Sequence, residues 1–147
     1  MESPKTRTNQ PEPALEALQM AAKQAALNSY SPYSGFRVGA ALLLSNGEIV
    51  TATNVENTSY GLTICAERAA LVRAVAQYGP EIRVVAAAVV NLNDTASPPC
   101  GACRQVLAEF MDPDAVVSFP AGSEGSVTTA TLSIAELLPF GFDMKLK

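Results

Sequence analysis

The sequence contains no histidine. This absence excludes a Ser-His-Asp triad, a Cys-His catalytic pair and every metal site that is built on imidazole. A metal site in this chain therefore has to use thiolates and carboxylates. The chain offers three cysteines and 14 acidic residues for that purpose.

Basic residues are few, and they do not cluster. The chain has 10 Lys and Arg against 14 Asp and Glu, for a net charge of −4. Four of the basic residues lie near the ends, at positions 5, 7, 145 and 147, and the other six occur singly. Nucleic-acid binding depends on basic stripes that displace counterions from phosphates. We therefore predict that the chain does not bind nucleic acid.

Long hydrophobic runs are also missing. The longest apolar run, Val84 to Val90, is too short to cross a bilayer. The first seven residues lack the apolar stretch of a signal peptide. We expect no membrane attachment, a cytoplasmic location and reduced cysteines. The length of 147 residues, 48% of them apolar, predicts a single globular domain over 13–147 after a disordered arm over 1–12.

The order of the apolar patterns predicts an α/β domain. Helical spacing indicates a first helix from about 14 to 28, and an Asn-Gly turn indicates a hairpin of strands 36–44 and 49–55. The later expected elements are helices 65–78 and 100–111 and strands 83–92, 115–119 and 127–132. A capping-box pattern, Ser133 with Glu136, predicts the start of a last helix. Helices and strands in this order form layers around a mixed sheet.

The three cysteines fall at the starts of two predicted helices. Cys100 and Cys103 form a C-x-x-C pair whose thiols share one helix face, and Cys65 begins another helix. Free N–H groups and the positive dipole end at helix N-termini favour thiolates, which suit Zn²⁺. Without histidine, a closed structural site would need a carboxylate as its fourth ligand. The alternative is three thiolates with water in the fourth position, which is typical of catalytic zinc.

Two residues that follow Cys65 have chemistry that fits such a site. Glu67 lies in the first helical turn, where its carboxylate can reach a site beyond the helix end and move protons for a zinc-bound water. Two positive charges against three thiolates leave one negative charge, which opposes acidification of that water. Arg68 lies on the same helix face as Cys65. We therefore predict that Arg68 bonds the thiolates and offsets their charge.

Taken together, these residues form the zinc deaminase signature, with Cys-Ala-Glu at one helix start and Pro-Cys-x-x-Cys at another. A dithiol redox protein of the thioredoxin type would give no role to Cys65 or Glu67. A non-catalytic zinc module is the other remote alternative. The sequence resembles the cytidine deaminase family, in its small, three-cysteine, homotetrameric branch. The matching segments are 36–42, 54–57, 65–70, 99–106 and 136–142.

This resemblance implies a three-layer α-β-α fold of the cytidine deaminase type, with a five-stranded mixed sheet flanked by helices. It implies one Zn²⁺ per chain and active sites at the subunit interfaces of a homotetramer. The implied reaction is hydrolytic deamination of cytidine and deoxycytidine to uridine and deoxyuridine, with release of ammonia, in pyrimidine salvage. Phe142 matches the aromatic residue that a neighbouring subunit lends to the base, and we expect Tyr60 to reach a neighbour's site as well.

The remaining expected contacts belong to the nucleoside. Asn54 and Glu56 alternate at a predicted strand end, so both face one side, and the family uses the matching pair for the 3′-hydroxyl. Phe36 is expected to pack on the pyrimidine ring, and backbone N–H groups near Ala66 are expected to bind the base carbonyl. A deaminase of an antibiotic of the blasticidin S type would share the zinc chemistry. The segment at Phe36 and the pair Asn54 and Glu56 favour an ordinary nucleoside over it.

Overall fold

The structure is a computed structural model that describes residues 12–123 and 125–144. The arm predicted over 1–12 lies outside the described residues, apart from Glu12, which begins the first helix. The helices are α1 (Glu12–Ala26), the short 3₁₀ helix η2 (Tyr60–Leu62), α2 (Ala66–Tyr78), α3 (Gly101–Ala108) and α4 (Ile134–Leu137). The strands are β1 (Val38–Leu44), β2 (Ile49–Thr53), β3 (Val84–Asn91), β4 (Met111–Ser123) and β5 (Ser126–Ser133).

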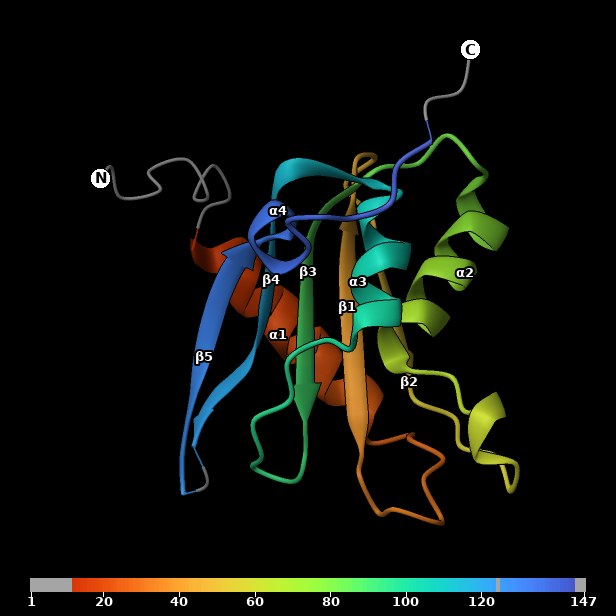
Figure 1. Ribbon diagram of the computed structural model, residues 1–147, viewed down its shortest axis with the longest axis vertical. Coiled ribbons are helices and arrows are strands. Elements are labelled where there is room, and N and C mark those ends of the chain that lie inside the picture. The colour runs from red at the N-terminus through yellow and green to blue at the C-terminus, as the bar shows by residue number, and fades with distance from the viewer. Residues whose placement is uncertain (1–11, 124, 145–147) are drawn as a thin grey trace.

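The five strands form one mixed sheet in the order β2-β1-β3-β4-β5. The pair β3–β4 is parallel, and the other three neighbouring pairs are antiparallel. Helix α1 lies behind the sheet in the view of Figure 1, while α2, α3 and α4 lie in front of it. The predicted three-layer α-β-α arrangement with a five-stranded mixed sheet is therefore confirmed.

Strand β1 shows how the sequence builds both sides of this core. Alternate side chains point to opposite faces of a strand. Ala40 and Leu42 accordingly pack in the cluster with α2 and α3, whereas Ala41 packs with residues of α1. A strand buried on both faces needs a nearly continuous apolar sequence, and β1 reads VGAALLL.

Gly39 brings α1 into direct contact with the sheet. A Cβ atom at this position would lie 1.8 Å from the carbonyl oxygen of Ala22 and 2.7 Å from the backbone nitrogen of Ala26. Both of these atoms belong to the backbone of α1. The helix can therefore lie on β1 at this distance only because residue 39 has no side chain.

One pair of predicted element bounds is wrong. The helix predicted over 100–111 ends at Ala108, and the strand predicted over 115–119 begins already at Met111 and continues to Ser123. Met111 pairs with Val84 of β3 at one end of the strand, and Ser123 pairs with Ser126 of β5 at the other. These pairing partners extend β4 through Asp and Pro residues of low strand propensity.

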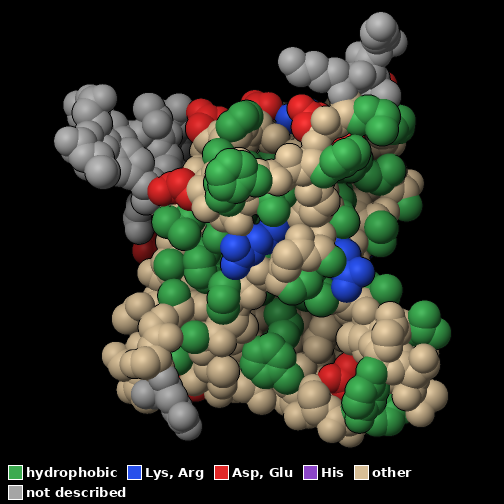
Figure 2. Space-filling model, viewed as in Figure 1, with side chains coloured by type: hydrophobic (Ala, Val, Ile, Leu, Met, Phe, Trp, Pro, Cys, Tyr) green, Lys and Arg blue, Asp and Glu red, His purple; other side chains and the backbone are tan. Residues whose placement is uncertain are grey.

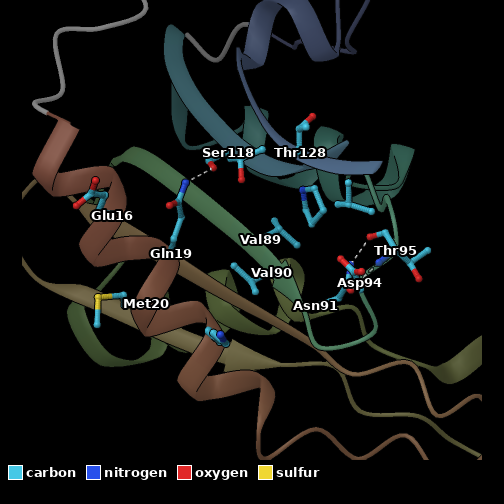
Figure 3. Close-up of a pocket in the computed structure, with 14 residues that line it drawn as sticks. Glu16, Gln19, Met20, Val89, Val90, Asn91, Asp94, Thr95, Ser118 and Thr128 are labelled. Atoms are coloured by element: carbon cyan, nitrogen blue, oxygen red, sulfur yellow. Dashed lines mark hydrogen bonds between the residues drawn. The ribbon is translucent and has the colours of Figure 1, made fainter. Parts of the chain in front are cut away.

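The α1 face of the sheet is only partly covered. A cavity of about 420 Å³ lies beside α1, over β3, β4 and β5. Figure 3 shows Gln19 and Met20 of α1 on one side of it and Ser118 and Thr128 on another. The Gln19 side-chain amide bridges the layers by donating a hydrogen bond to Ser118 Oγ at 2.9 Å. Among the described residues, no helix has the length and hydrophobicity needed to cross a membrane.

Candidate metal centre and active site

The three cysteine sulfurs meet where α2 and α3 begin. Cys65 is the N-cap residue of α2, Cys100 is the N-cap residue of α3, and Cys103 is buried in the first turn of α3. Their Sγ atoms all lie within 4.8 Å of one another, and those of Cys65 and Cys100 are 3.9 Å apart. Tetrahedral zinc with Zn–S bonds of about 2.3 Å holds its sulfurs about 3.8 Å apart. This donor set therefore fits zinc.

The cysteines do not cap their helices in the usual way. Neither Cys65 nor Cys100 makes a side-chain cap hydrogen bond. The first N–H groups of a helix have no partners within that helix. Together with the helix dipoles, these groups give the site a positive environment that suits thiolates.

The groups around Cys65 favour its thiolate form. Hydrogen bonds from the Cys103 thiol and the Arg68 guanidinium lower the pKa of Cys65 to about 5, against the opposing effect of burial. Cys103 is the proton donor in this pair, and its own pKa is raised by that hydrogen bond and by burial. In the metal-free site, Cys65 is therefore favoured as the thiolate and Cys103 as the neighbouring thiol, which a metal ion would deprotonate on binding.

Arg68 lies at the place that the sequence predicts for it. Its Nη2 donates to Cys65 Sγ at 3.4 Å. Contact with the cysteine sulfurs raises the pKa of Arg68, so the guanidinium stays charged. Its Nε is the one buried side-chain nitrogen or oxygen without a hydrogen-bond partner among the described residues. The positive charge therefore lies against the sulfur cluster, where it can offset the excess negative charge of three thiolates.

We predict that Arg68→Gln weakens zinc binding by about 10- to 100-fold, the range found when residues that support metal ligands are removed. Turnover should fall as well, because the uncompensated charge opposes acidification of the bound water. Competition with a chelator measures zinc affinity, and steady-state kinetics on the loaded enzyme measure turnover. Arg73→Gln is the matched control, because Arg73 lies on the same helix but bonds the Thr51 carbonyl at 2.7 Å. Unchanged affinity and turnover in Arg68→Gln would show that Arg68 has no such role.

Glu67 is a buried acid beside the sulfur cluster. It is the second residue of α2, and its side chain is only 5% exposed. Burial raises the pKa of this carboxyl group, and the negative charge of Cys65 raises it further. A carboxyl group with a raised pKa exchanges protons closer to neutral pH than an exposed one does. Its neighbour Ala66 is fully buried, so the start of α2 lies against the core.

Asn54 lies just beyond the end of β2, and most of the hydrogen-bonding capacity of its side-chain amide is taken up by other residues of the chain. The residue is 7% exposed. Its Oδ1 accepts hydrogen bonds from the Val38 backbone N–H at 3.1 Å and from Ser29 Oγ at 2.5 Å. Its Nδ2 donates to the Phe36 carbonyl at 2.8 Å. An amide nitrogen has two N–H groups, so one donor is left over, whereas the oxygen is already satisfied. Phe36 itself packs partly buried against the main core.

Glu56 is held by the loop that precedes β1. Its Oε1 accepts backbone hydrogen bonds from Tyr33 at 2.9 Å and Ser34 at 3.2 Å, and its Oε2 accepts one from Ser34 Oγ. The Ser34 hydroxyl is the main cause that lowers the pKa of Glu56. A cavity of about 170 Å³ is lined here by Glu56, Tyr33, Ser34, Tyr60 and Thr63. The rings of Tyr33 and Tyr60 meet edge to face, with centroids 5.9 Å apart.

The segment that carries Phe142 is fastened to α3. The Gln105 amide donates to the Phe142 carbonyl at 2.8 Å, and its oxygen accepts from the Phe142 N–H at 3.0 Å. Arg104 bonds the carbonyls of Pro99 at 2.7 Å and Leu137 at 2.8 Å. The Phe142 ring nevertheless remains 72% exposed. Figure 2 shows the face with α2 and α3, where hydrophobic side chains gather in several patches around a hollow and basic side chains form small, separate groups.

The sequence patterns did not single out Ser34 or Gln105. Ser34 stands in a segment whose composition indicates a loop, but its partner Glu56 is 22 residues away in the sequence. Gln105 sits next to the cysteine motif, while its partner Phe142 is 37 residues away. Such long-range pairs leave no local pattern. The structure brings both residues into contact with residues that we expect to bind substrate.

Comparison with known proteins agrees with this site. A family model described as the cytidine and deoxycytidylate deaminase zinc-binding region matches residues 12–119. The cytidine deaminase of Halalkalibacterium halodurans is 47% identical over 119 residues, which are 81% of this chain and 86% of that protein.

Solved structures agree as well. The crystal structure of cytidine deaminase from Mycobacterium tuberculosis matches with a TM-score of 0.74 at 38% identity, over 88% of this chain and 97% of that one. The structure from Burkholderia pseudomallei matches with a TM-score of 0.72 at 43% identity, over 86% and 98% of the two chains. The predicted family, fold and enzyme class are confirmed, and this chain belongs to the cytidine deaminase family.

Proposed function

We propose that this chain catalyses the zinc-dependent hydrolytic deamination of cytidine and deoxycytidine to uridine and deoxyuridine, with release of ammonia, as a step of pyrimidine salvage. The observation that carries the proposal is the cluster of three cysteine sulfurs, within 4.8 Å of one another, beside the buried carboxyl group of Glu67. The relatives named cytidine deaminases support the choice of substrate.

Cys65, Cys100 and Cys103 would hold one zinc ion per chain, and Arg68 would offset the surplus charge of the thiolates. When bound, zinc supplies the Lewis acidity that lowers the pKa of a water molecule toward neutrality. Glu67 would accept one proton from the attacking water and deliver it to N3 of the cytosine ring. The water oxygen would add at C4, and the second proton of the water would pass to the amino group as the C4–N bond breaks, so that one water is consumed and one ammonia is released. Glu67 thus acts as a proton carrier.

Asn54 and Glu56 would together bind the ribose through hydrogen bonds to its 3′-hydroxyl. The remaining amide N–H of Asn54 can donate to the oxygen of the 3′-hydroxyl, because Asn54 Oδ1 is already occupied. Glu56 can accept the proton of the same hydroxyl, because a carboxylate is a pure acceptor. At the base, the Phe36 ring packs on the pyrimidine, and N–H groups at the start of α2, near Ala66, bind the carbonyl oxygen.

We also propose that the chain works as a homotetramer in which Phe142 and Tyr60 reach a neighbouring site. The side chains of Phe142 and Tyr60 are 72% and 74% exposed, so both are accessible to a neighbouring chain. Sedimentation analysis of the purified protein measures the number of chains, and a stable monomer would contradict this part of the proposal.

A cytoplasmic location fits the need of the cysteine ligands to stay reduced.

Ultraviolet absorbance of purified protein with cytidine, deoxycytidine, CMP and blasticidin S tests the function. Cytidine and deoxycytidine should be deaminated, and kcat/KM for CMP should be at least about tenfold lower, since the carboxylate of Glu56 repels a phosphate. Metal analysis should find one zinc per chain. Protein stripped by a chelator should lose activity and regain it with zinc.

Each alternative has its own outcome in this experiment. Turnover of blasticidin S without turnover of cytidine would identify an antibiotic deaminase. Reversible disulfide formation between Cys100 and Cys103, without bound zinc, would identify a redox protein. One zinc per chain with no turnover of any of the four compounds would indicate a non-catalytic zinc module.

A further inference from the structure

We propose that Ser34 is a positioning residue that holds Glu56 in the orientation needed to accept the ribose 3′-hydroxyl. This inference rests on the proposed role of Glu56. Ser34 is not one of the signature residues 65–67 and 99–103, and it has no part in the proposed zinc chemistry. We infer its function from its contacts alone.

Ser34 contacts both oxygens of the Glu56 carboxylate. Its hydroxyl donates to Oε2, and its backbone N–H donates to Oε1 at 3.2 Å. The Tyr33 N–H adds a third bond, to Oε1 at 2.9 Å. A serine hydroxyl has only one proton to donate, and Ser34 uses it on Glu56. The carboxylate therefore cannot rotate without breaking a bond to this loop.

The same hydroxyl also links the sugar side of the site to its base side. Ser34 Oγ accepts a hydrogen bond from the Phe36 backbone N–H at 2.9 Å. One oxygen atom thus contacts both Glu56, expected at the ribose, and Phe36, expected at the pyrimidine. Within the described part of the chain, Ser34 is the one residue whose side chain donates a hydrogen bond to the Glu56 carboxylate. The spacing of Glu56 and Phe36 therefore depends on Ser34.

Removal of the hydroxyl should leave the fold in place. The loop and the end of β2 are also joined by backbone bonds, from Tyr30 N to the Asn54 carbonyl at 3.2 Å and from Glu56 N to the Tyr30 carbonyl at 2.8 Å. Ser34 itself is exposed. In Ser34→Ala the loop therefore keeps its position, while the carboxylate of Glu56 gains rotational freedom that substrate binding must again remove.

The experiment compares kcat/KM for cytidine and 3′-deoxycytidine, which lacks the hydroxyl that Glu56 is proposed to read. In Ser34→Ala the preference for cytidine should fall about three- to tenfold, the effect of one side chain that has to be immobilised on binding. The loss should appear mainly as a higher KM for cytidine, with 3′-deoxycytidine nearly unaffected. Ser34→Thr keeps the hydroxyl and should keep the preference.

Two further variants make the result specific. Ser59→Ala is the matched control, because Ser59 is an exposed serine near Tyr60 that makes no side-chain cap hydrogen bond; it should leave the preference unchanged. Glu56→Ala is the reference, since it removes the carboxylate itself. Addition of Ser34→Ala to Glu56→Ala should cause no further loss of preference, because Ser34 acts through Glu56.

The outcomes separate this inference from the function on which it rests. If Glu56→Ala leaves the preference intact, Glu56 does not read the hydroxyl, and the proposed role of Glu56 is wrong. If Glu56→Ala lowers the preference but Ser34→Ala does not, the role of Ser34 is refuted and that of Glu56 stands. A higher preference in Ser34→Ala would mean that the serine competes with the sugar for the carboxylate, which also overturns the inference.

Discussion

Replacement of Glu67 by alanine should abolish deamination while one zinc ion stays bound to the chain. The carboxyl group is the proton carrier of the proposed reaction, and loss of general acid–base catalysis lowers turnover by up to about four orders of magnitude. We expect kcat/KM for cytidine to fall at least about a thousandfold. Ultraviolet absorbance measures this at enzyme concentrations high enough to detect the residual activity. Metal content should remain at one zinc per chain, because the three sulfurs suffice as ligands.

Glu67→Gln separates the loss of the proton carrier from the loss of packing. Burial raises the pKa of Glu67, so the folded metal-free chain disfavours the ionised carboxylate relative to the unfolded chain. As pH rises above the pKa that Glu67 has in the unfolded chain, this difference lowers the free energy of unfolding. Hence metal-free Glu67→Gln should have a melting temperature at pH 7 at least as high as that of the parent. With zinc bound, it should be just as inactive as Glu67→Ala.

Glu48→Gln serves as the control, since Glu48 lies exposed at the turn between β1 and β2. It should keep full activity. Loss of zinc in both Glu67 variants would make Glu67 a ligand or a structural residue. Turnover above one tenth of the parent rate in Glu67→Gln would exclude its role as the proton carrier.

Replacement of Gly39 by alanine should destabilise the protein by at least about 3 kcal/mol. The added Cβ would meet the Ala22 carbonyl oxygen at 1.8 Å, and no rotamer can relieve a collision with backbone atoms. Helix α1 must therefore move off β1, or the strand must shift and disturb its pairs on both sides. Urea denaturation of the purified variant measures the free energy of unfolding, and we expect a lower midpoint with little change in slope.

Gly61→Ala is the matched control for this experiment. A Cβ atom at Gly61 would meet nothing within 4 Å, so the change should shift the free energy of unfolding by less than about 1 kcal/mol. If Gly39→Ala is as stable as Gly61→Ala, the close approach of α1 to β1 does not describe the protein. If Gly39→Ala cannot be purified in folded form, thermal melting in cell lysate provides the comparison with Gly61→Ala.

The sequence predicted most of the fold because its strongest patterns are local. The run from Val84 to Val90 is apolar on both faces, which indicates a central strand, and the hairpin turn at Asn46 and Gly47 joins β1 to β2 as expected. The capping box at Ser133 and Glu136 is also present. The bounds of β4 could not be predicted, since pairing with β3 and β5 decides where that strand begins and ends.

The cluster of three cysteine sulfurs could be predicted from residue type and spacing. Three cysteines in a chain without histidine leave few other ways to build a zinc site, and helix starts at Cys65 and Cys100 bring the sulfurs together. Contacts such as Ser34 with Glu56 and Gln105 with Phe142 depend on tertiary structure. Ser34 and Gln105 are polar residues of common types, and nothing in the sequence around them distinguishes them from other loop or helix residues.

The way α2 and α3 begin differs from the way α4 begins. At α4, Ser133 accepts a hydrogen bond from the Glu136 N–H at 3.1 Å, and Glu136 bonds back to Ser133. The cysteines that begin α2 and α3 make no such bond, and an absent cap weakens a helix by about 1 kcal/mol. The two helix starts that carry the proposed zinc ligands thus give up local stability, whereas a serine in their place would stabilise the helix but could not act as a soft thiolate ligand.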